Sequence, residues 1–141
     1  MKEKVLISAC LLGVNCKYSG DNNYNKELID KLNEQYDLIP ICPEIMGGLS
    51  TPRNPAEIRD GKVFNNQGDE VTKDFQKGAE EALKIAKILN VNKAILKSKS
   101  PSCGKGLIYD GKFNNKLIEG NGITTDLLLK NKIQVISDKE I

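Results

Sequence analysis

Short apolar segments rich in β-forming residues alternate along this chain with segments that carry the apolar spacing of amphipathic helices. The expected strands cover residues 5–9, 38–41, 93–97 and 133–136, and the expected helices cover residues 26–36, 72–90 and 124–130. Such alternation is typical of βαβ units, which build a parallel sheet with helices on both faces. The sequence therefore predicts an α/β fold, namely a single Rossmann-like domain over residues 1–141 with a mainly parallel sheet of about four strands.

Two stretches outside this pattern are expected to form small β-hairpins beside the main sheet. Residues 57–71 contain Asp60-Gly61, and residues 107–113 contain Asp110-Gly111. An Asp-Gly pair between short apolar segments predicts a hairpin, because both residues tolerate the backbone conformation of a tight turn.

The long helix expected over residues 72–90 begins with a residue that can cap it. The Thr72 hydroxyl is placed to accept a hydrogen bond from the first turn, where Asp74 interacts favourably with the helix dipole. At helical spacing, the side expected to be buried carries Phe75, Ala79, Ala82, Leu83, Ala86 and Leu89.

Residues 41–57 concentrate conformationally restricted and reactive residues after the second expected strand. They include three prolines and two glycines together with Cys42, Glu44, Arg53 and Glu57. Prolines and glycines argue against a regular helix or a central strand, so a stiff loop is predicted here. Loops held by a rigid scaffold often carry function, and we expect Arg53 to pair with Glu57 and brace this one.

Three loops that begin at the carboxyl ends of expected strands each carry a cysteine: Cys10, Cys42 and Cys103. In a parallel sheet these ends lie at one edge, where ligands of α/β proteins bind. The three thiols, distant in sequence, are therefore expected to meet in space. They are open to three interpretations at this point: buried thiols, ligands of a metal or cluster, or redox groups.

The sequence contains no histidine, which restricts its metal chemistry. Zinc sites usually contain histidines or closely spaced cysteine pairs, and neither occurs in this sequence. Iron–sulfur clusters are held by thiolates and accept ligands scattered along a chain. Cys16 is open to interpretation as a fourth ligand, a resolving thiol or a structurally neutral residue, and we favour the neutral role.

Glu44 and the segment 98–106 supply candidates for catalysis. Glu44 lies two residues after Cys42, where apolar surroundings and thiolates would raise its pKa towards the range useful for proton transfer. A solvated loop residue or helix cap is the alternative. Residues 98–106 combine hydroxyls, glycines and lysines, and form either an anion-binding nest or a plain polar turn. Ser100 and Ser102 are both candidate donors to a substrate oxygen or sulfur.

The overall composition narrows the class of protein. With 39% hydrophobic residues, 28% charged residues and a net charge of +2, the chain suits a soluble globular protein better than a dedicated polyanion binder. It has no apolar run of transmembrane length and no signal-peptide core, so we expect a cytoplasmic protein without a membrane partner. In that compartment the four cysteines do not predict a disulfide framework.

Three sequence blocks, in this order, match a known family pattern. They are Ser8-Ala9-Cys10-Leu11-Leu12-Gly13 with Lys17-Tyr18-Ser19-Gly20, Cys42-Pro43-Glu44 with the glycines and prolines up to Glu57, and Lys97-Ser98-Lys99-Ser100-Pro101-Ser102-Cys103-Gly104. The chain resembles the thiouracil desulfidase (TudS) family, long catalogued as a domain of unknown function. The resemblance spans nearly the whole chain, although Lys17-Tyr18-Ser19-Gly20 stands where the family pattern usually has Arg-Tyr-Asp-Gly.

The resemblance implies an enzyme whose [4Fe-4S] cluster is held by Cys10, Cys42 and Cys103, with one iron free to take sulfur from a thiolated pyrimidine. It also implies Glu44 as the proton donor and acceptor for the attacking water, and Ser100 as a group that assists at the substrate. The implied reaction is non-redox: water replaces sulfur at the C=S carbon, and sulfide leaves. A small thiouracil or thiouridine is the expected partner rather than nucleic acid, and the protein is expected to be a monomer or homodimer.

Two other classes of function use the same residues differently. A non-catalytic iron–sulfur or sulfide carrier would employ the same three thiolates without converting an organic substrate. A simple anion-binding domain would leave the cysteines buried and chemically idle.

Overall fold

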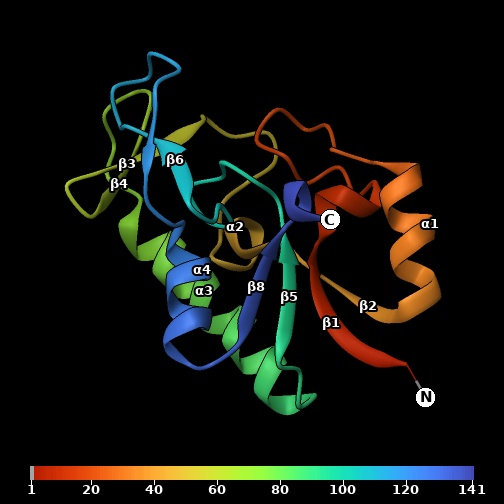
Figure 1. Cartoon of the computed structure of the whole chain (residues 1–141). Helices are drawn as coiled ribbons and strands as arrows, with labels where there is room; N and C mark the ends of the chain where they lie inside the picture. Colours follow the sequence, from red (N-terminus) through yellow and green to blue (C-terminus); the bar gives the residue numbers. More distant parts are fainter. Residues whose placement is uncertain (1) are drawn as a thin grey trace.

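The computed structural model describes residues 2–141 and contains a central sheet of four parallel strands (Figure 1). The strands lie in the order β2-β1-β5-β8, with bounds Glu3–Ser8 for β1, Tyr36–Ile41 for β2, Lys93–Leu96 for β5 and Gln134–Ser137 for β8. The predicted α/β fold, with a mainly parallel sheet and flanking helices, is confirmed.

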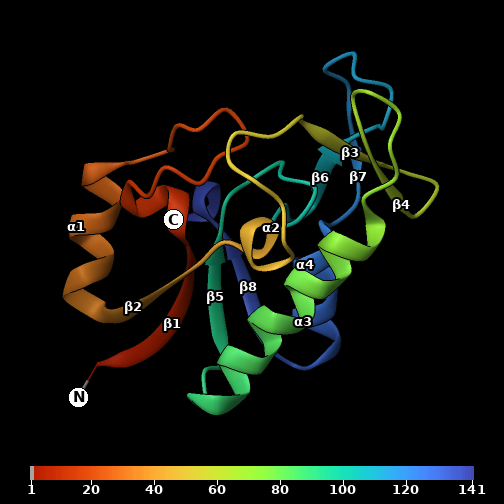
Figure 2. The same cartoon turned by 180° about the vertical axis from the view of Figure 1, so that it is seen from behind.

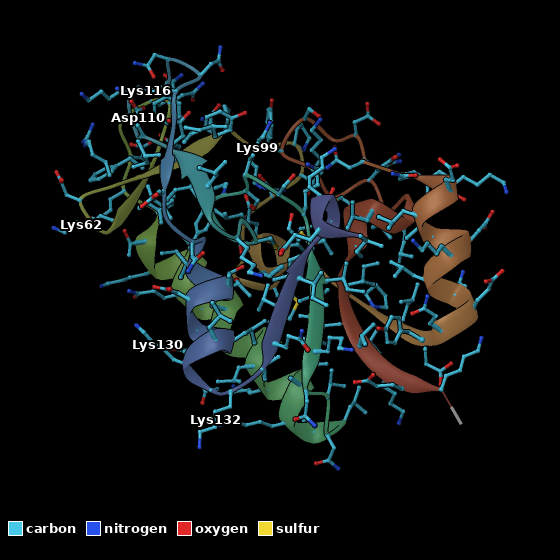
Figure 3. The ribbon with its side chains drawn as sticks, in the orientation of Figure 1. Lys62, Lys99, Asp110, Lys116, Lys130 and Lys132 are labelled. Carbon is cyan, nitrogen blue, oxygen red and sulfur yellow. The ribbon has the colours of Figure 1, made fainter. Side chains whose placement is uncertain are left out.

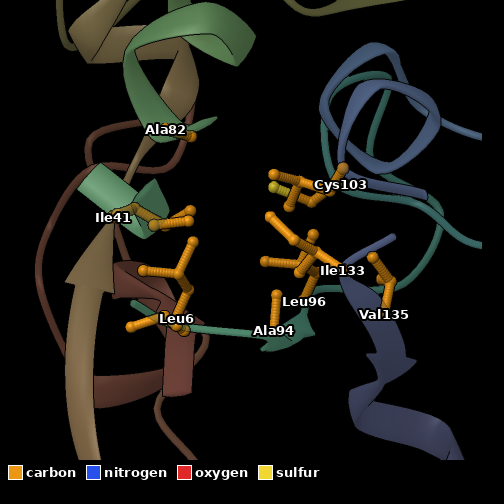
Figure 4. Close-up of a cluster of buried hydrophobic side chains, with 11 residues drawn as sticks. Leu6, Ile41, Ala82, Ala94, Leu96, Cys103, Ile133 and Val135 are labelled. Atoms are coloured by element: carbon orange, nitrogen blue, oxygen red, sulfur yellow. The ribbon is translucent and has the colours of Figure 1, made fainter. Parts of the chain in front are cut away.

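Helices cover both faces of the sheet, which accounts for the nearly continuous apolar character of its strands. Helix α1 (Lys26–Gln35) lies on one face, whereas α3 (Thr72–Ile88) and α4 (Ile123–Lys130) lie on the other (Figures 1 and 2). Side chains of β1 alternate accordingly: Val5 packs with α1, and Leu6 packs in the cluster shared with α3 and α4 (Figure 4). Within residues 2–141, no helix combines the length and the hydropathy that a membrane-spanning segment requires.

The hairpin predicted around Asp60-Gly61 is confirmed. Strand β3 (Ala56–Arg59) pairs antiparallel with β4 (Lys62–Asn65), and both turn residues have positive φ angles. Aspartate and glycine tolerate this left-handed conformation better than most residues, so the local sequence is sufficient to place the turn.

The second predicted hairpin exists, but its turn was predicted wrongly. Strand β6 (Leu107–Tyr109) pairs antiparallel with β7 (Leu117–Glu119), so residues 110–116 form a long loop rather than a tight turn at Asp110-Gly111. The reason is tertiary: two backbone amides of this loop hydrogen-bond to a side chain of β3 instead of across the hairpin.

The long helix begins at Thr72 as predicted, but Thr72 does not cap it. The N-cap residue is Val71, and the Thr72 hydroxyl instead accepts the Val63 N–H of β4 at 2.9 Å. This hydrogen bond ties the start of α3 to the neighbouring hairpin. The predicted apolar side is buried at Phe75, Ala79, Ala82 and Ala86, partly buried at Leu83, and exposed at Leu89.

One turn of helix, α2 (Pro43–Met46), interrupts the segment that the sequence predicts to be a loop throughout. That prediction is wrong for these residues because Pro43 occupies the first helical position, where a missing N–H breaks no intrahelical hydrogen bond. A Cβ atom on Gly47 would collide with the Asp74 carbonyl of α3, and one on Gly78 would collide with the Pro43 carbonyl. The two glycines therefore let the backbones of α2 and α3 touch.

The strand order places a topological switch next to β1. The chain passes from β1 to β2 on one side and then to β5 on the other side of β1. The loops after β1, β2 and β5 leave the sheet at the same edge (Figure 1). Ligands of open α/β sheets bind in the crevice beyond such an edge.

Replacing Gly78 by alanine should destabilise the protein, although alanine is the better helix former. In an unobstructed helix Gly→Ala stabilises by about 0.5–1 kcal/mol. Here the added methyl group meets backbone atoms of α2, so we expect the free energy of unfolding to fall by about 1–3 kcal/mol, measured by chemical denaturation.

The neighbouring exposed position provides the control for this variant. Lys77→Ala should change the free energy of unfolding by less than about 0.5 kcal/mol. Unchanged or increased stability of Gly78→Ala would contradict the close backbone approach of α2 and α3.

Candidate functional site

A cavity of about 560 Å³ lies beyond the carboxyl ends of β1, β2 and β5. All of the proposed site residues line it: Cys10, Cys42, Glu44, Ser100 and Cys103. The expectation that three thiols from separate loops meet in space is therefore confirmed.

Strand register brings the first two thiols to the cavity. Parallel pairing of β1 with β2 aligns Ser8 with Ile41, so Cys10 and Cys42 leave the sheet at the same level. Cys10 lies in the 3-10 helix Ala9–Leu12, and Cys42 is the N-cap residue of α2. Short helical turns directly after the strands thus hold both side chains at the cavity.

Cys103 lies in the loop after β5 and is anchored by its neighbours. Its N–H donates to Ser100 Oγ at 3.0 Å, and its carbonyl accepts the Thr125 hydroxyl at 2.8 Å. Cys103 lines the cavity and also belongs to the buried apolar cluster beneath it (Figure 4). Burial raises the pKa of Cys103 to about 12, so binding of a cation has to displace the proton of this thiol.

Cys16 is buried against the other two thiols. A hydrogen bond with its side chain is the main reason why the pKa of Cys10 falls to about 7 and that of Cys42 to about 6. The pKa of Cys16 is raised, because hydrogen bonds to Cys10 and Cys42 favour its protonated form. Cys16 thus lies next to two candidate ligands, a placement that sequence reasoning missed.

The donors at the cavity are thiols, which are the usual ligands of iron–sulfur clusters. In the described part of the chain, no three cysteine or carboxylate side chains are close enough together to hold one metal ion. A four-iron cluster binds each thiolate through a different iron and therefore needs its ligands spread around a cavity. Cys10, Cys42 and Cys103 all line the cavity, and the pKa values of Cys10 and Cys42 are already lowered.

A buried ion pair joins Glu44 to Arg53 beside the thiols. Arg53 Nε donates to Glu44 Oε1 at 3.1 Å, and the two side chains are only 8% and 17% exposed for Arg53 and Glu44. Burial raises the pKa of Glu44, and the charge of Arg53 partly opposes that rise. The expected direction of the Glu44 shift is therefore confirmed.

Arg53 also holds two loops in place. Its Nη1 atom donates to the Ser50 carbonyl at 3.2 Å and to the Thr51 hydroxyl at 3.1 Å, and its Nη2 atom donates to the Cys16 carbonyl at 2.8 Å. The predicted pairing of Arg53 with Glu57 is wrong. Glu57 lies on β3, and its carboxylate bonds to the loop between β6 and β7 instead.

Ser100 and Ser102 have different environments. Ser102 is fully buried, and its hydroxyl pairs with the Thr124 hydroxyl at 2.7 Å. Ser100 lines the cavity, and its hydroxyl oxygen accepts the N–H groups of Ser102 at 3.1 Å and Cys103 at 3.0 Å. Both lone pairs of the Ser100 oxygen are then occupied, which leaves its proton free to donate to a group in the cavity.

Further residues reach the cavity without a signal in the sequence pattern. Asn23 hydrogen-bonds to the Cys10 side chain, and Tyr109, Phe113 and Asn115 form part of the wall. The last three belong to or adjoin the loop between β6 and β7, which is held by contacts with β3 and by a bridge between Ile108 and Lys99.

Positive charge borders the same space. Lys17, Lys97 and Lys99 line the cavity, and Lys99 lies at the end of the molecule that also carries Asp110 and Lys116 (Figure 3). The cavity therefore combines thiols with side chains of both charges, since Glu44 and Glu57 also line it.

A second cavity, of about 490 Å³, shares Glu44, Arg53 and Ala56 with the first. Its other walls include Asn54 and Asn65. Glu44 is thus accessible from two cavities rather than one.

The sequence and fold match known proteins. The profile of the 2-thiouracil desulfurase family matches residues 5–140. The chain belongs to this family. A relative in Bacillus subtilis (strain 168), the uncharacterized protein YbbK, is 41% identical in an alignment of 147 positions that covers 97% of each chain. A solved structure named [4Fe-4S]-dependent thiouracil desulfidase TudS is 40% identical, with a TM-score of 0.92 over 99% of this chain and 93% of that chain.

Membership of the 2-thiouracil desulfurase family confirms the resemblance that the three sequence blocks indicate. The α/β fold is shared with TudS over almost the whole length of both chains.

In this 2-thiouracil desulfurase family member, Arg53→Met should lower the free energy of unfolding by about 3–5 kcal/mol, because Glu44 is left buried without its partner. Arg53→Lys should recover only part of the loss, since one ammonium group cannot reproduce the contacts with Glu44, Thr51 and Cys16. Chemical denaturation measures both variants.

The exposed ion pair between Lys84 and Glu81 serves as the comparison. Lys84→Met should change the free energy of unfolding by less than about 1 kcal/mol. An equally small effect of Arg53→Met would show that the buried pair does not hold the loops together.

Proposed function

We propose that the protein is an iron–sulfur-dependent desulfidase that removes sulfur as sulfide from a thiolated pyrimidine by hydrolytic substitution at the C=S carbon. The observation that carries this proposal is the convergence of Cys10, Cys42 and Cys103 on one cavity beside the buried Glu44. Membership of the 2-thiouracil desulfurase family and the likeness to a [4Fe-4S]-dependent thiouracil desulfidase support it.

Cys10, Cys42 and Cys103 would hold a [4Fe-4S] cluster. When bound through three thiolates, such a cluster supplies an open, Lewis-acidic iron that prefers sulfur to oxygen ligands. Cys16 is left outside the ligand set in this proposal, and the Cys16→Ala variant described below tests that assignment. Such an iron site would bind the sulfur of a thiocarbonyl. It needs no histidine ligand, and the sequence contains none.

Glu44 is the proton-transfer residue in this proposal. Its carboxylate takes one proton from the water that attacks the C=S carbon and later returns it to the departing sulfur. The second proton of that water also ends on the sulfur as the C=O bond forms, so the overall reaction is C=S plus water giving C=O plus hydrogen sulfide. Arg53 engages Oε1 of Glu44, which leaves Oε2 for the water. Glu44 also lines the second cavity, which in this proposal supplies the attacking water.

Ser100 orients the substrate. Its oxygen is held by two backbone amides, so its hydroxyl proton points to a fixed place and can donate to a ring oxygen, nitrogen or sulfur. Ser102 does not take this role because it is buried against Thr124.

The substrate class is a small thiolated base or nucleoside of the thiouracil or thiouridine type. A cavity of about 560 Å³ is in the range of small-molecule sites, and a net charge of +2 gives little support for a nucleic-acid substrate. A cytoplasmic location suits such a substrate and an oxygen-sensitive cluster.

Anaerobic reconstitution with iron and sulfide tests the cluster assignment. The wild-type protein should bind about four iron atoms and absorb broadly in the visible region, as Cys-ligated [4Fe-4S] clusters do. Cys10→Ala, Cys42→Ala and Cys103→Ala should each lose most of the bound iron. Cys16→Ala is the matched control and should retain it.

The same preparation separates the enzyme from a carrier. Incubation with 2-thiouracil or 4-thiouridine should release sulfide and yield the oxo-pyrimidine. Iron-loaded protein that releases no sulfide from any thiopyrimidine would favour a non-catalytic carrier, and protein that takes up no iron would overturn the proposal.

Glu44→Gln should keep the cluster and lose turnover. The amide preserves the shape of the side chain but cannot accept the proton, so kcat for 2-thiouracil should fall by about 10²–10⁴-fold. Iron content and visible absorption should match the wild type, and Glu34→Gln on the exposed side of α1 should leave both properties unchanged. Full activity of Glu44→Gln would remove Glu44 from the mechanism.

A further inference from the structure

The loop of residues 110–116, here called the Phe113 loop, joins β6 to β7 and forms part of the cavity wall. It projects from the sheet beside the β3–β4 hairpin (Figures 1 and 2). Phe113 and Asn115 of the loop line the same cavity as the cysteines. The loop and the thiols therefore border the same cavity.

Phe113 adopts an unfavourable backbone conformation. Its φ angle is 56°, in the left-handed region that bulky residues rarely occupy, whereas Gly111 (88°) and Asn115 (63°) are residue types that tolerate it. Strain of this kind persists only where the surrounding structure enforces it, and it concentrates at functional sites. An asparagine or glycine at position 113 would form the same loop more easily, so the turn alone does not require an aromatic residue.

Glu57 enforces this conformation from the neighbouring hairpin. Its Oε1 atom accepts the N–H of Gly111 at 3.0 Å and the N–H of Phe113 at 3.1 Å. Gly111 also packs against β3, because a Cβ atom there would collide with the Ile58 carbonyl and with Arg59. The backbone on both sides of the Phe113 ring is thus fixed relative to the cavity.

The Phe113 ring is not part of the hydrophobic core. It is 38% exposed, and it belongs to neither of the two buried apolar clusters that pack on the sheet. A single exposed aromatic residue has no meaning by itself. Here the exposed ring lies in the wall of a cavity lined by three candidate cluster ligands, on a backbone that is strained and clamped.

We propose that Phe113 is a specificity-determining residue that stacks its ring on the pyrimidine ring of the substrate. The identity of the substrate rests on the proposed function, whereas the stacking role rests on the geometry of the Phe113 loop. Stacking recognises a flat conjugated heterocycle and is insensitive to its substituents. It would hold the pyrimidine while Ser100 and the cluster site engage its polar edge, and it would distinguish thiouracil from small non-cyclic thioamides such as thiourea.

The experiment compares the iron-loaded wild type with Phe113→Ala, Phe113→Tyr and Leu107→Ala. Leu107 is 46% exposed on the same hairpin and does not line the cavity, so it is the matched control. Steady-state kinetics give kcat and KM for 2-thiouracil, and anaerobic calorimetry gives the Kd of uracil, which contains no sulfur and is not converted.

Phe113→Ala should raise KM for 2-thiouracil and Kd for uracil by about tenfold, within the range seen when aromatic residues that stack on bases are replaced by alanine. The change in kcat should be much smaller, and the preference for 2-thiouracil over thiourea should shrink by the same factor. Phe113→Tyr should retain the KM and Kd of the wild type because it keeps the aromatic ring. Leu107→Ala should behave as the wild type.

A fourth variant, Phe113→Asn, separates stacking from packing. Because asparagine tolerates a positive φ angle, the midpoint of thermal unfolding should be unchanged or higher, while uracil binding weakens as in Phe113→Ala. A lower midpoint together with unchanged affinity would make Phe113 a packing residue and overturn the proposal.

The outcomes for the inference and for the proposed function are distinct. Sulfide release from 2-thiouracil with an unaltered KM and Kd in Phe113→Ala overturns the stacking role alone. Iron-loaded wild type that neither converts 2-thiouracil nor binds uracil overturns both.

Discussion

Parallel pairing of β1 with β2 on one side and with β5 on the other is the constraint on which the site depends. Parallel strands end at the same edge, so the residues that follow them meet regardless of their distance in sequence. Cys10, Cys42 and Cys103 come from three separate loops and line one cavity for this reason. A shift in the register of β1 by one residue would exchange its two apolar faces and separate the first two thiols.

Close backbone contact between α2 and α3 adds precision to this arrangement. Gly47 and Gly78 remove the Cβ atoms that would otherwise hold the two helices apart. Helix α2 is only one turn long, and isolated turns of helix are unstable, so its position comes from this contact rather than from its own hydrogen bonds. Both Cys42, at its N-cap, and Glu44, in its first turn, depend on the same pair of glycines.

Arg53 and Glu57 each order a different group of loops around the cavity. The guanidinium of Arg53 joins Glu44 to the carbonyls of Ser50 and Cys16, and so orders the side of the cavity next to the thiols. The carboxylate of Glu57 orders the loop between β6 and β7, which includes Phe113. Both groups are charged and hydrogen-bonded to backbone, which makes these contacts stronger than neutral ones. Rigid placement of this kind is what a site needs to hold a substrate against a reactive centre.

The sequence by itself determined the alternation of strands and helices, the β3–β4 turn at Asp60-Gly61 and the presence of a cysteine after each of three strands, because these depend on local periodicity and turn chemistry. Tertiary structure alone decided which charged groups pair, that Ser102 is buried against Thr124, and that residues 110–116 form a loop at the cavity. Those outcomes depend on contacts between segments far apart in the chain. Hydrogen bonds between such distant segments produce no periodic pattern in the sequence. Their partners are therefore determined by which side chains the fold places close together.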